Sequence, residues 1–137
     1  MVGADKMRVA LVGKGRWGNI LIPYIKEQFN LIEIGGKTLN IQKTAKKIDA
    51  FFIATPIDTH YKIVKECLEL KKHVFVEKPL STTVKECEEL KQLAQKQNVV
   101  LYTDYTEMVA PARHKMKELL SQLGDIIHVE AVTLKNA

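Results

Sequence analysis

Cysteine is scarce in this sequence, which contains only two cysteines among 137 residues. Cys67 and Cys87 lie in separate stretches of helical spacing, and no short spacing between them matches a metal site. This argues against a disulfide scaffold and a cysteine metal centre. We expect two reduced thiols in the core of a cytoplasmic protein.

Long apolar runs and blocks of one charge are also missing. No apolar run approaches the ~18 residues that cross a membrane, and no signal peptide opens the sequence, so we expect no membrane partner. The net charge is +5, but the lysines are spread along the chain and aromatic residues do not alternate with them. This argues against a nucleic-acid partner, although a positive field would attract an anionic cofactor or substrate.

The composition that remains is ordinary for a globular protein, with 46% hydrophobic and 27% charged residues. A chain of this length can bury a real core, and we expect one domain over residues 1–137.

A glycine motif near the N-terminus organises the rest of the sequence. The apolar run 9–12 ends in Gly13-x-Gly15-x-x-Gly18, and helical spacing of apolar residues follows over 17–25. This order predicts a strand, a tight turn and a helix. Gly13 lets the chain reverse, Gly15 lets the backbone approach a pyrophosphate, and Gly18 lets the helix pack on the strand. Free N–H groups at the start of that helix would face the phosphates of a nucleotide.

Strands and helices alternate along the remaining sequence. Further strands are predicted at 30–34, 50–55, 73–76, 99–103 and 126–134. Asp58 or Thr59 is the expected cap of the helix after the third strand, Thr83 and Glu86 form a capping box for the next helix, and a last helix spans 111–123. The alternation predicts an α/β fold with a doubly wound parallel sheet of the Rossmann type.

The end of the second strand is unusual, because a dinucleotide fold normally carries an acidic residue there for the ribose hydroxyls. Glu33 stands near the expected distance from the glycines, but its position inside the strand could point it away. Lys37 and Thr38 would suit a 2′-phosphate better than a free diol, so NAD and NADP both stay open, with NADP slightly favoured. The segment 36–49 is too short for a full crossover helix and strand, and leaves room for a brief edge strand at 37–41 and about two helical turns at 42–48.

Four segments would reach the carboxyl edge of such a sheet, where ligands bind. They are 13–18, 55–60, 77–79 and 104–107. Lys78 matters most, because an ammonium beside a strand end can polarise a carbonyl, hold a hydroxyl or exchange a proton. The alternative is a surface lysine lying beside Glu77.

Other residues at this edge have two interpretations each. His60 could line a nicotinamide pocket, but a lone histidine in the first turn of a helix is more often structural. Tyr102, Asp104 and Tyr105 could touch substrate or merely end their strand.

Together these segments resemble the N-terminal half of the glucose–fructose oxidoreductase, inositol dehydrogenase and rhizopine-catabolism (Gfo/Idh/MocA) family. The resemblance rests on the glycine motif, on Ala54-Thr55-Pro56 with His60, on His73-Val-Phe-Val-Glu77-Lys78-Pro79-Leu80, and on 111–119 and 124–126. The segment 103–134 further resembles members that oxidise nucleotide-linked sugars.

The resemblance implies NAD(P)-dependent hydride transfer at a sugar or polyol hydroxyl, with Lys78 beside the nicotinamide as the residue that assists proton transfer. Thr55, Pro56 and His60 would border the nicotinamide. The full expected cofactor-binding set is Gly13, Gly15, Arg16, Trp17, Gly18, Lys37, Thr38, Thr55, Pro56, His60 and Glu77.

The sequence departs from the family pattern after the second strand and at Ala137, where the family's substrate and dimerisation domain would begin. We therefore expect weak cofactor binding and little or no turnover by this chain alone. One alternative is a non-catalytic interaction module with a degenerate dinucleotide fold, and a weaker one is a site for another nucleotide-like ligand such as S-adenosylmethionine. An uncovered strand at 126–134 would invite pairing into a homo-oligomer.

Overall fold

The structure, a computed structural model, describes residues 6–36, 39–130 and 132. The chain up to Asp104 forms one compact unit, and the chain from Tyr105 onward forms a second.

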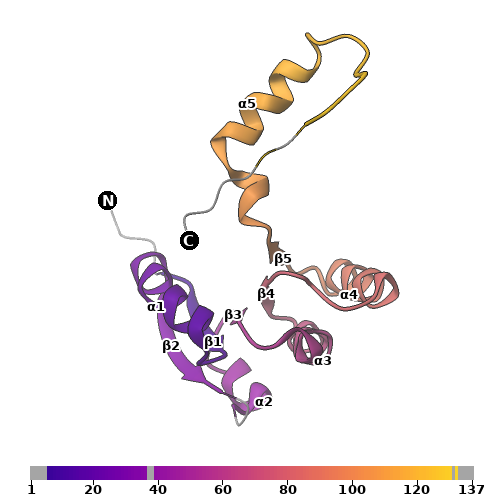
Figure 1. Cartoon of the computed structure of the whole chain (residues 1–137). Helices are drawn as coiled ribbons and strands as arrows, with labels where there is room; N and C mark the ends of the chain where they lie inside the picture. Colours follow the sequence, from indigo (N-terminus) through magenta and orange to yellow (C-terminus); the bar gives the residue numbers. More distant parts are fainter. Residues whose placement is uncertain (1–5, 37–38, 131, 133–137) are drawn as a thin grey trace. The chain divides into compact units, whose positions relative to one another are not determined.

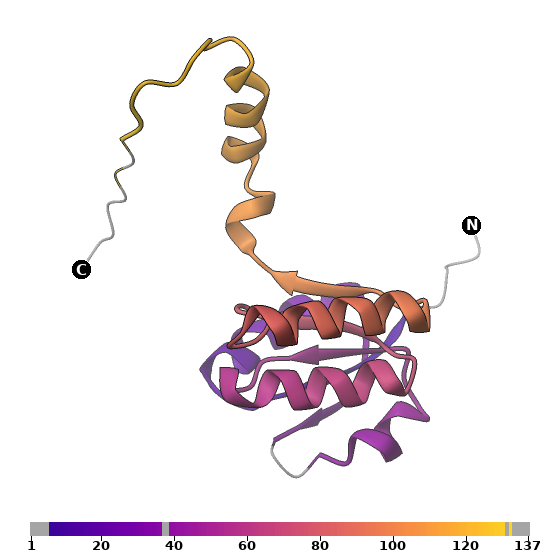
Figure 2. The same ribbon diagram turned by 90° about the vertical axis from the view of Figure 1, so that its right-hand side faces the viewer.

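The first unit is a parallel sheet of five strands in the order β2-β1-β3-β4-β5 (Figure 1). Its strands are β1 (Arg8–Val12), β2 (Asn30–Gly35), β3 (Ala50–Ile53), β4 (His73–Glu77) and β5 (Leu101–Asp104). Its helices are α1 (Arg16–Gln28), α2 (Ile41–Ala45), α3 (Ile57–Glu69) and α4 (Val84–Gln97). The helices α3 and α4 pack side by side on one face of the sheet, and α1 lies on the other (Figure 2). The predicted Rossmann-type α/β class is confirmed.

The centre of the sheet is the core of this unit. Every residue of β3 is buried, as are the last four of β1, because these central strands have neighbours on both edges and helices over them. This double burial explains why their sequences are continuous apolar runs rather than alternating ones. The rings of Phe29, Phe52, Phe75 and Tyr102 form a row in which successive centroids lie 5.3, 4.9 and 5.4 Å apart.

Between β2 and β3 the chain is shortened, as the sequence predicts. Residues 39–49 contain α2 and no strand, so β2 is an edge of the sheet. The brief edge strand predicted at 37–41 is not formed at 39–41, and its first two residues lie outside the described ones. The helix begins after Asn40, whose side chain accepts a hydrogen bond of 2.8 Å from the Lys43 backbone N–H, and it ends at Ala45, earlier than predicted. Leu39 packs directly on Gly35, where an added Cβ would lie 2.6 Å from the Leu39 Cβ.

The caps of α3 and α4 differ in how well the sequence predicted them. Thr83 caps α4, and its hydroxyl accepts the Glu86 N–H at 3.2 Å, as expected. The expectation that Asp58 or Thr59 caps α3 is wrong, because α3 begins directly after Pro56 without a side-chain cap. Pro56 fixes an extended backbone before the helix, and Thr59 instead donates its hydroxyl to the Pro56 carbonyl at 2.6 Å.

The second unit contains η1 (Thr106–Val109) and α5 (Pro111–Leu120). The strand predicted at 126–134 is not formed at 126–130 or at residue 132, and the predicted helix ends three residues early. A strand needs a neighbour to satisfy its backbone, and the described part of this unit offers none. Its large apolar side chains are accordingly exposed, among them Met116, Leu123 and Ile127.

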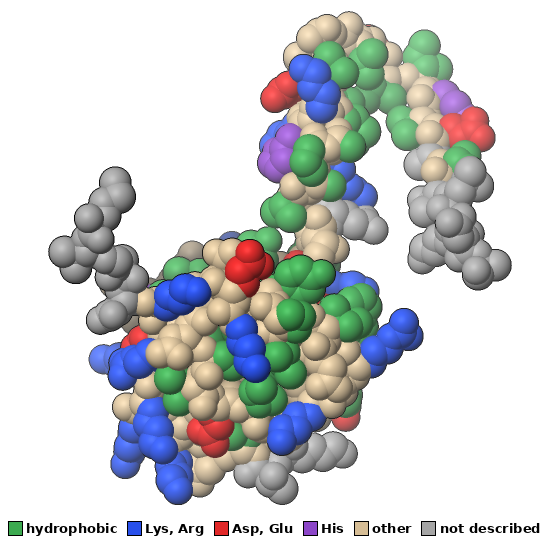
Figure 3. Space-filling view, turned by 90° about the vertical axis from the view of Figure 1, so that its left-hand side faces the viewer, with side chains coloured by type: hydrophobic (Ala, Val, Ile, Leu, Met, Phe, Trp, Pro, Cys, Tyr) green, Lys and Arg blue, Asp and Glu red, His purple; other side chains and the backbone are tan. Residues whose placement is uncertain are grey.

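Two surface properties bear on possible partners. No helix within the described part of the chain combines the length and apolarity that crossing a membrane requires. On the face shown in Figure 3, lysine and arginine side chains are scattered among other residues rather than joined in one basic area.

A charged pair ties the beginnings of β1 and β3 together. The Asp49 carboxylate accepts from the Arg8 backbone N–H at 3.0 Å, from Nε at 3.1 Å and from Nη2 at 2.7 Å. These contacts, the hydrogen bond from the Arg8 side chain above all, lower the pKa of Asp49 to about 2. The Asp49 backbone also links β1 to β4, since its N–H donates to the Arg8 carbonyl and its carbonyl accepts from His73.

We predict that this pair makes the fold sensitive to acid in a defined range. A depressed native pKa stabilises the fold above the ordinary aspartate pKa of about 4, and that stabilisation is lost as the pH falls through about 2. Asp49→Asn should therefore unfold at lower urea concentration than the wild type at pH 7, with the difference shrinking below pH 4. The control is Glu118→Gln, which removes the exposed Lys115–Glu118 pair and should leave the transition unchanged. Equal urea midpoints for Asp49→Asn and wild type at pH 7 would contradict this role.

Candidate functional site

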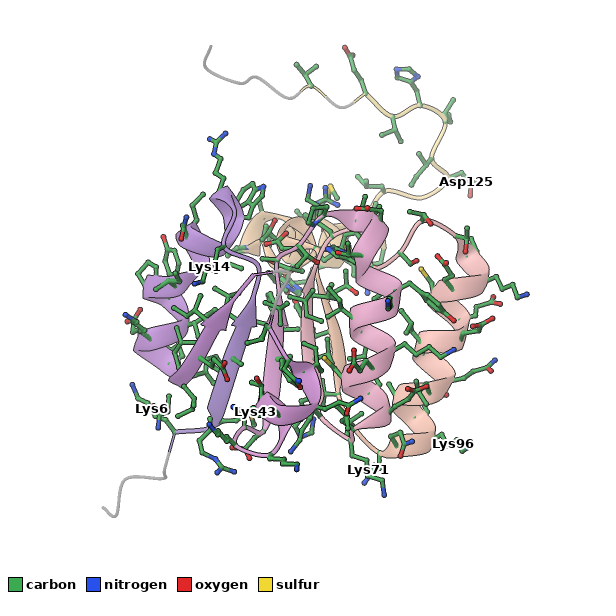
Figure 4. The ribbon with its side chains drawn as sticks, turned by 90° about the horizontal axis from the view of Figure 1, so that it is seen from below. Lys6, Lys14, Lys43, Lys71, Lys96 and Asp125 are labelled. Atoms are coloured by element: carbon green, nitrogen blue, oxygen red, sulfur yellow. The ribbon has the colours of Figure 1, made fainter. Side chains whose placement is uncertain are left out.

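The glycine turn lies at the carboxyl edge of the sheet, between β1 and α1. Figure 4 places Lys14, which is part of this turn, at one end of the strands and Lys6, Lys71 and Lys96 at the other. Gly13 has a φ of +120°, and its N–H donates to the Gly35 carbonyl at 2.7 Å, which joins the turn to the end of β2. A backbone hydrogen bond thus fixes the start of the turn to β2.

The three glycines meet different surroundings. A Cβ on Gly13 would lie 2.3 Å from the Ala54 carbonyl oxygen, and a Cβ on Gly18 would lie 2.0 Å from the Gly13 oxygen. Both glycines are therefore required by close packing of backbone on backbone. Gly15 is different, because nothing lies within 4 Å of a Cβ added there. The space beside Gly15 is open for a ligand.

The start of α1 supplies hydrogen-bond donors to that space. Gly15 is the N-cap, no side chain caps the helix, and no acidic residue stands in the first turn. The first N–H groups of a helix have no carbonyl partners within it, and its N-terminus carries a partial positive charge. Arg16 and Trp17 form the first turn with exposed side chains, Trp17 being 59% exposed. An anion is the ligand that this arrangement favours.

The segment after β3 is fixed by His60, which α3 holds inward and which is only 1% exposed. Its Nε2 lies 2.8 Å from the Thr55 carbonyl oxygen and its Nδ1 2.8 Å from the Pro79 carbonyl oxygen. Both ring nitrogens are therefore occupied by backbone. The structure supports the structural interpretation of His60, which joins the loops after β3 and β4, rather than a direct contact with a cofactor.

At the ends of β4 and β5 two carboxylates face each other. Glu77 and Asp104 are register partners, and both are partly buried. Burial, and secondly the charge of Asp104, raises the pKa of Glu77, while Lys78 and His60 oppose that shift. Burial also raises the pKa of Asp104. This corner of the edge thus holds acidic groups that keep their protons more readily than exposed carboxylates.

Lys78 follows Glu77 directly and is exposed at the same edge. Its peptide bond to Pro79 is cis. The Lys78 ammonium forms no hydrogen bond or ion pair with any described residue, so it is available to a ligand.

A cavity of about 440 Å³ lies between the ends of β1 and β2 and the helices α2 and α3. The ends of β1 and β2 line it with Val12 and Gly36, the α2 region with Leu39 and Ile41, and α3 and the segment before it with Thr55, Pro56, Asp58, Thr59, Lys62, Ile63 and Glu66. Its volume falls within the ~300–1,000 Å³ usual for small-molecule sites. Sequence reasoning missed the charged residues of α3 here, although their spacing of four would have placed them on one helix face.

Glu33, the acidic residue predicted as a possible ribose contact, does not line this cavity. Its carboxylate accepts a hydrogen bond of 2.9 Å from the Thr44 hydroxyl of α2. Lys37 and Thr38 lie outside the described residues.

A larger cavity, of about 700 Å³, lies between α4 and β5 and is lined by apolar and polar residues in equal number. It contains none of the residues that the sequence predicts for the site, so its size does not make it the functional centre. Among the described residues no group of three or more His, Cys, Asp or Glu is placed to hold a metal ion.

Comparison with known proteins agrees with this geometry. Residues 33–105, more than half of the chain, match the Gfo/Idh/MocA model described as "Oxidoreductase family, NAD-binding Rossmann fold". A myo-inositol 2-dehydrogenase of Thermotoga maritima is 28% identical over 134 residues, which cover 82% of this chain and 40% of that protein.

Solved structures show the same fold at lower identity. UDP-N-acetylglucosamine 3-dehydrogenase GnnA from Acidithiobacillus ferrooxidans superposes with a TM-score of 0.77 at 20% identity, covering 83% of this chain and 42% of that one. Biliverdin reductase from Synechocystis, solved with biliverdin and NADP⁺, gives 0.73 at 22% identity, covering 87% and 44%. This chain therefore spans less than half the length of these proteins. With more than half of it matched by the family model, the chain belongs to the Gfo/Idh/MocA oxidoreductase family, within its NAD-binding Rossmann domain.

Proposed function

We propose that this chain is the cofactor-binding part of an NAD(P)-dependent oxidoreductase. The observation that carries the proposal is the open space beside Gly15 at the uncapped start of α1, on the same sheet edge as the unpaired ammonium of Lys78. Backbone donors without a competing side chain suit a pyrophosphate. Family membership supports a nicotinamide dinucleotide as the ligand that contains this pyrophosphate.

The residues present fit the two ends of such a cofactor. The N–H groups at the start of α1, from Gly15 to Gly18, would hold the pyrophosphate. The adenosine would extend toward the cavity between β2 and α3, and the nicotinamide toward Thr55, Glu77 and Lys78. When bound, the nicotinamide ring supplies the site that accepts or donates a hydride.

Lys78 is the proposed proton-handling residue. As an ammonium, its Nζ would donate a hydrogen bond to the substrate oxygen. As a neutral amine, it would accept the hydroxyl proton while the hydride leaves the carbon for the nicotinamide, and both roles require hydrogen-bond reach of that oxygen. His60 is a positioning residue in this proposal, because it fixes the carbonyls of Thr55 and Pro79 on either side. Glu77 and Asp104 set the charge around the ammonium.

The proposed substrate is a hydroxyl-bearing sugar or polyol. Two of the similar proteins are named for myo-inositol and for UDP-N-acetylglucosamine, which share a ring with several secondary hydroxyl groups, whereas biliverdin reductase is named for a different class of molecule. Since this chain spans less than half of those proteins, we propose the chemical class of the substrate and not its identity.

A second candidate is an interaction module that keeps the fold and does not bind a dinucleotide. The shortened segment 39–49, which leaves β2 as a sheet edge, favours it. The cavity of about 440 Å³ beside that edge favours the cofactor instead, because room for an adenosine remains.

Binding of NADH and NADPH tests the proposal directly, by fluorescence or calorimetry with the whole chain. Gly15→Ala should fold normally and weaken both cofactors by at least about tenfold, because its methyl group fills the space meant for the pyrophosphate. Gly18→Ala should instead lower the melting temperature by at least about 5 °C, because its Cβ meets the Gly13 carbonyl. Failure of the wild type to bind either cofactor at millimolar concentration would overturn the proposal.

The role of Lys78 is tested by separating binding from turnover. Lys78→Ala should leave the affinity for NADH or NADPH within about twofold, since backbone donors of α1 carry the phosphate binding. It should abolish any hydride transfer that the chain performs, alone or as part of a longer enzyme, as followed by nicotinamide absorbance. Lys96→Ala, which removes the same charge from an exposed side chain at the opposite end of the strands, is the control for turnover. Hydride transfer by Lys78→Ala at the wild-type rate would remove Lys78 from the mechanism.

A further inference from the structure

The charged residues of the cavity between β2 and α3 have no part in the proposed hydride transfer. Asp58, Lys62 and Glu66 are spaced four apart on α3, and all three line the cavity together with Gly36 and Val12. The cavity is thus bounded by the ends of β1 and β2 on one side and by a charged helix face on the other.

Within the described residues, the end of β2 offers the cavity no carboxylate for the hydroxyl groups of a ribose. Glu33 is held by Thr44 and so does not offer its carboxylate to the cavity. Gly36 lines the cavity, and nothing lies within 4 Å of a Cβ added to it. The position where a ribose-binding carboxylate would stand is therefore open space.

Lys62 is the cation that faces this space from the other side. Its side chain is exposed, it lines the cavity, and its ammonium forms no hydrogen bond or ion pair with any described residue. A lysine ammonium is a common ligand of phosphate. Lys65, which follows on the same helix, donates instead to the Tyr61 hydroxyl at 3.2 Å.

Resting on the proposed function, we propose that Lys62 binds the 2′-phosphate of NADP, so that α3 supplies the residue that selects NADP over NAD. Asp58 and Glu66 flank Lys62 one turn away on either side and oppose a phosphate by charge. The preference for NADP is then a balance between one ammonium and two carboxylates. Removing the ammonium and removing a carboxylate of this cavity must therefore shift the preference for NADP in opposite directions.

The test compares NADPH and NADH affinities of the whole chain by calorimetry. Lys62→Gln should weaken NADPH by about tenfold, the usual worth of a charged hydrogen bond, and leave NADH within about twofold. Glu66→Gln should strengthen NADPH and leave NADH unchanged. Lys65→Gln makes the same change of charge on the same helix and should alter neither. The adenosine end can be probed alone with two nucleotides. Lys62→Gln should bind 2′-AMP more weakly than the wild type does and should bind 5′-AMP equally well.

The outcomes separate this inference from the function on which it rests. Binding of both cofactors with no selective loss of NADPH in Lys62→Gln overturns the role of Lys62 and leaves the cofactor site standing. Equal losses of affinity for NADH and NADPH in Lys62→Gln also overturn the role of Lys62, because they indicate a general effect on the cavity. Absence of binding by either cofactor to the wild type overturns the proposed function and this assignment with it.

Discussion

The site depends on close contact between three stretches of backbone at the carboxyl edge of the sheet. They are the glycine turn at Gly13, the first turn of α1 at Gly18 and the end of β3 at Ala54, and no side chain separates them. Gly18 lies against the Gly13 carbonyl, and Gly13 lies against the Ala54 carbonyl, each too close for a single methyl group. This contact sets the start of α1 directly over the ends of β1 and β3. The free N–H groups of the helix and the loop after β3 consequently share one edge, which is the condition for a ligand to touch both.

A second constraint extends this arrangement to β4. The ring of His60 lies between the carbonyls of Thr55 and Pro79, and burial protects both contacts from competing water. The loop that carries Lys78 is thereby held to the loop after β3, which the Gly13 contact already fixes. Buried contacts thus fix the backbone that carries Lys78, although the Lys78 side chain itself is exposed.

The sequence predicted those features that local chemistry determines. The glycine turn, the apolar runs of β1 and β3 and the Thr83 cap follow from backbone geometry and from burial on both faces of a sheet. It failed where a partner outside the segment decides the outcome. The run at 126–130 has strand-forming residues but no described neighbour to pair with, and the start of α3 is set by Pro56 rather than by a capping side chain. The sequence favoured a structural His60 over one that contacts a ligand, and the two carbonyl partners of its ring support that interpretation.

The shortened crossover between β2 and β3 closes the core with few residues. Leu39 packs onto Gly35, and Ile41 is buried at the start of α2, so five helical residues close the core where a longer helix and strand would otherwise stand. These side chains do not fill the cavity beside them, because Gly36 contributes no side chain and α3 lines the cavity with Asp58, Lys62 and Glu66 as well as the apolar Ile63. The shortened crossover therefore leaves an open, partly charged cavity, which the proposed function assigns to the adenosine.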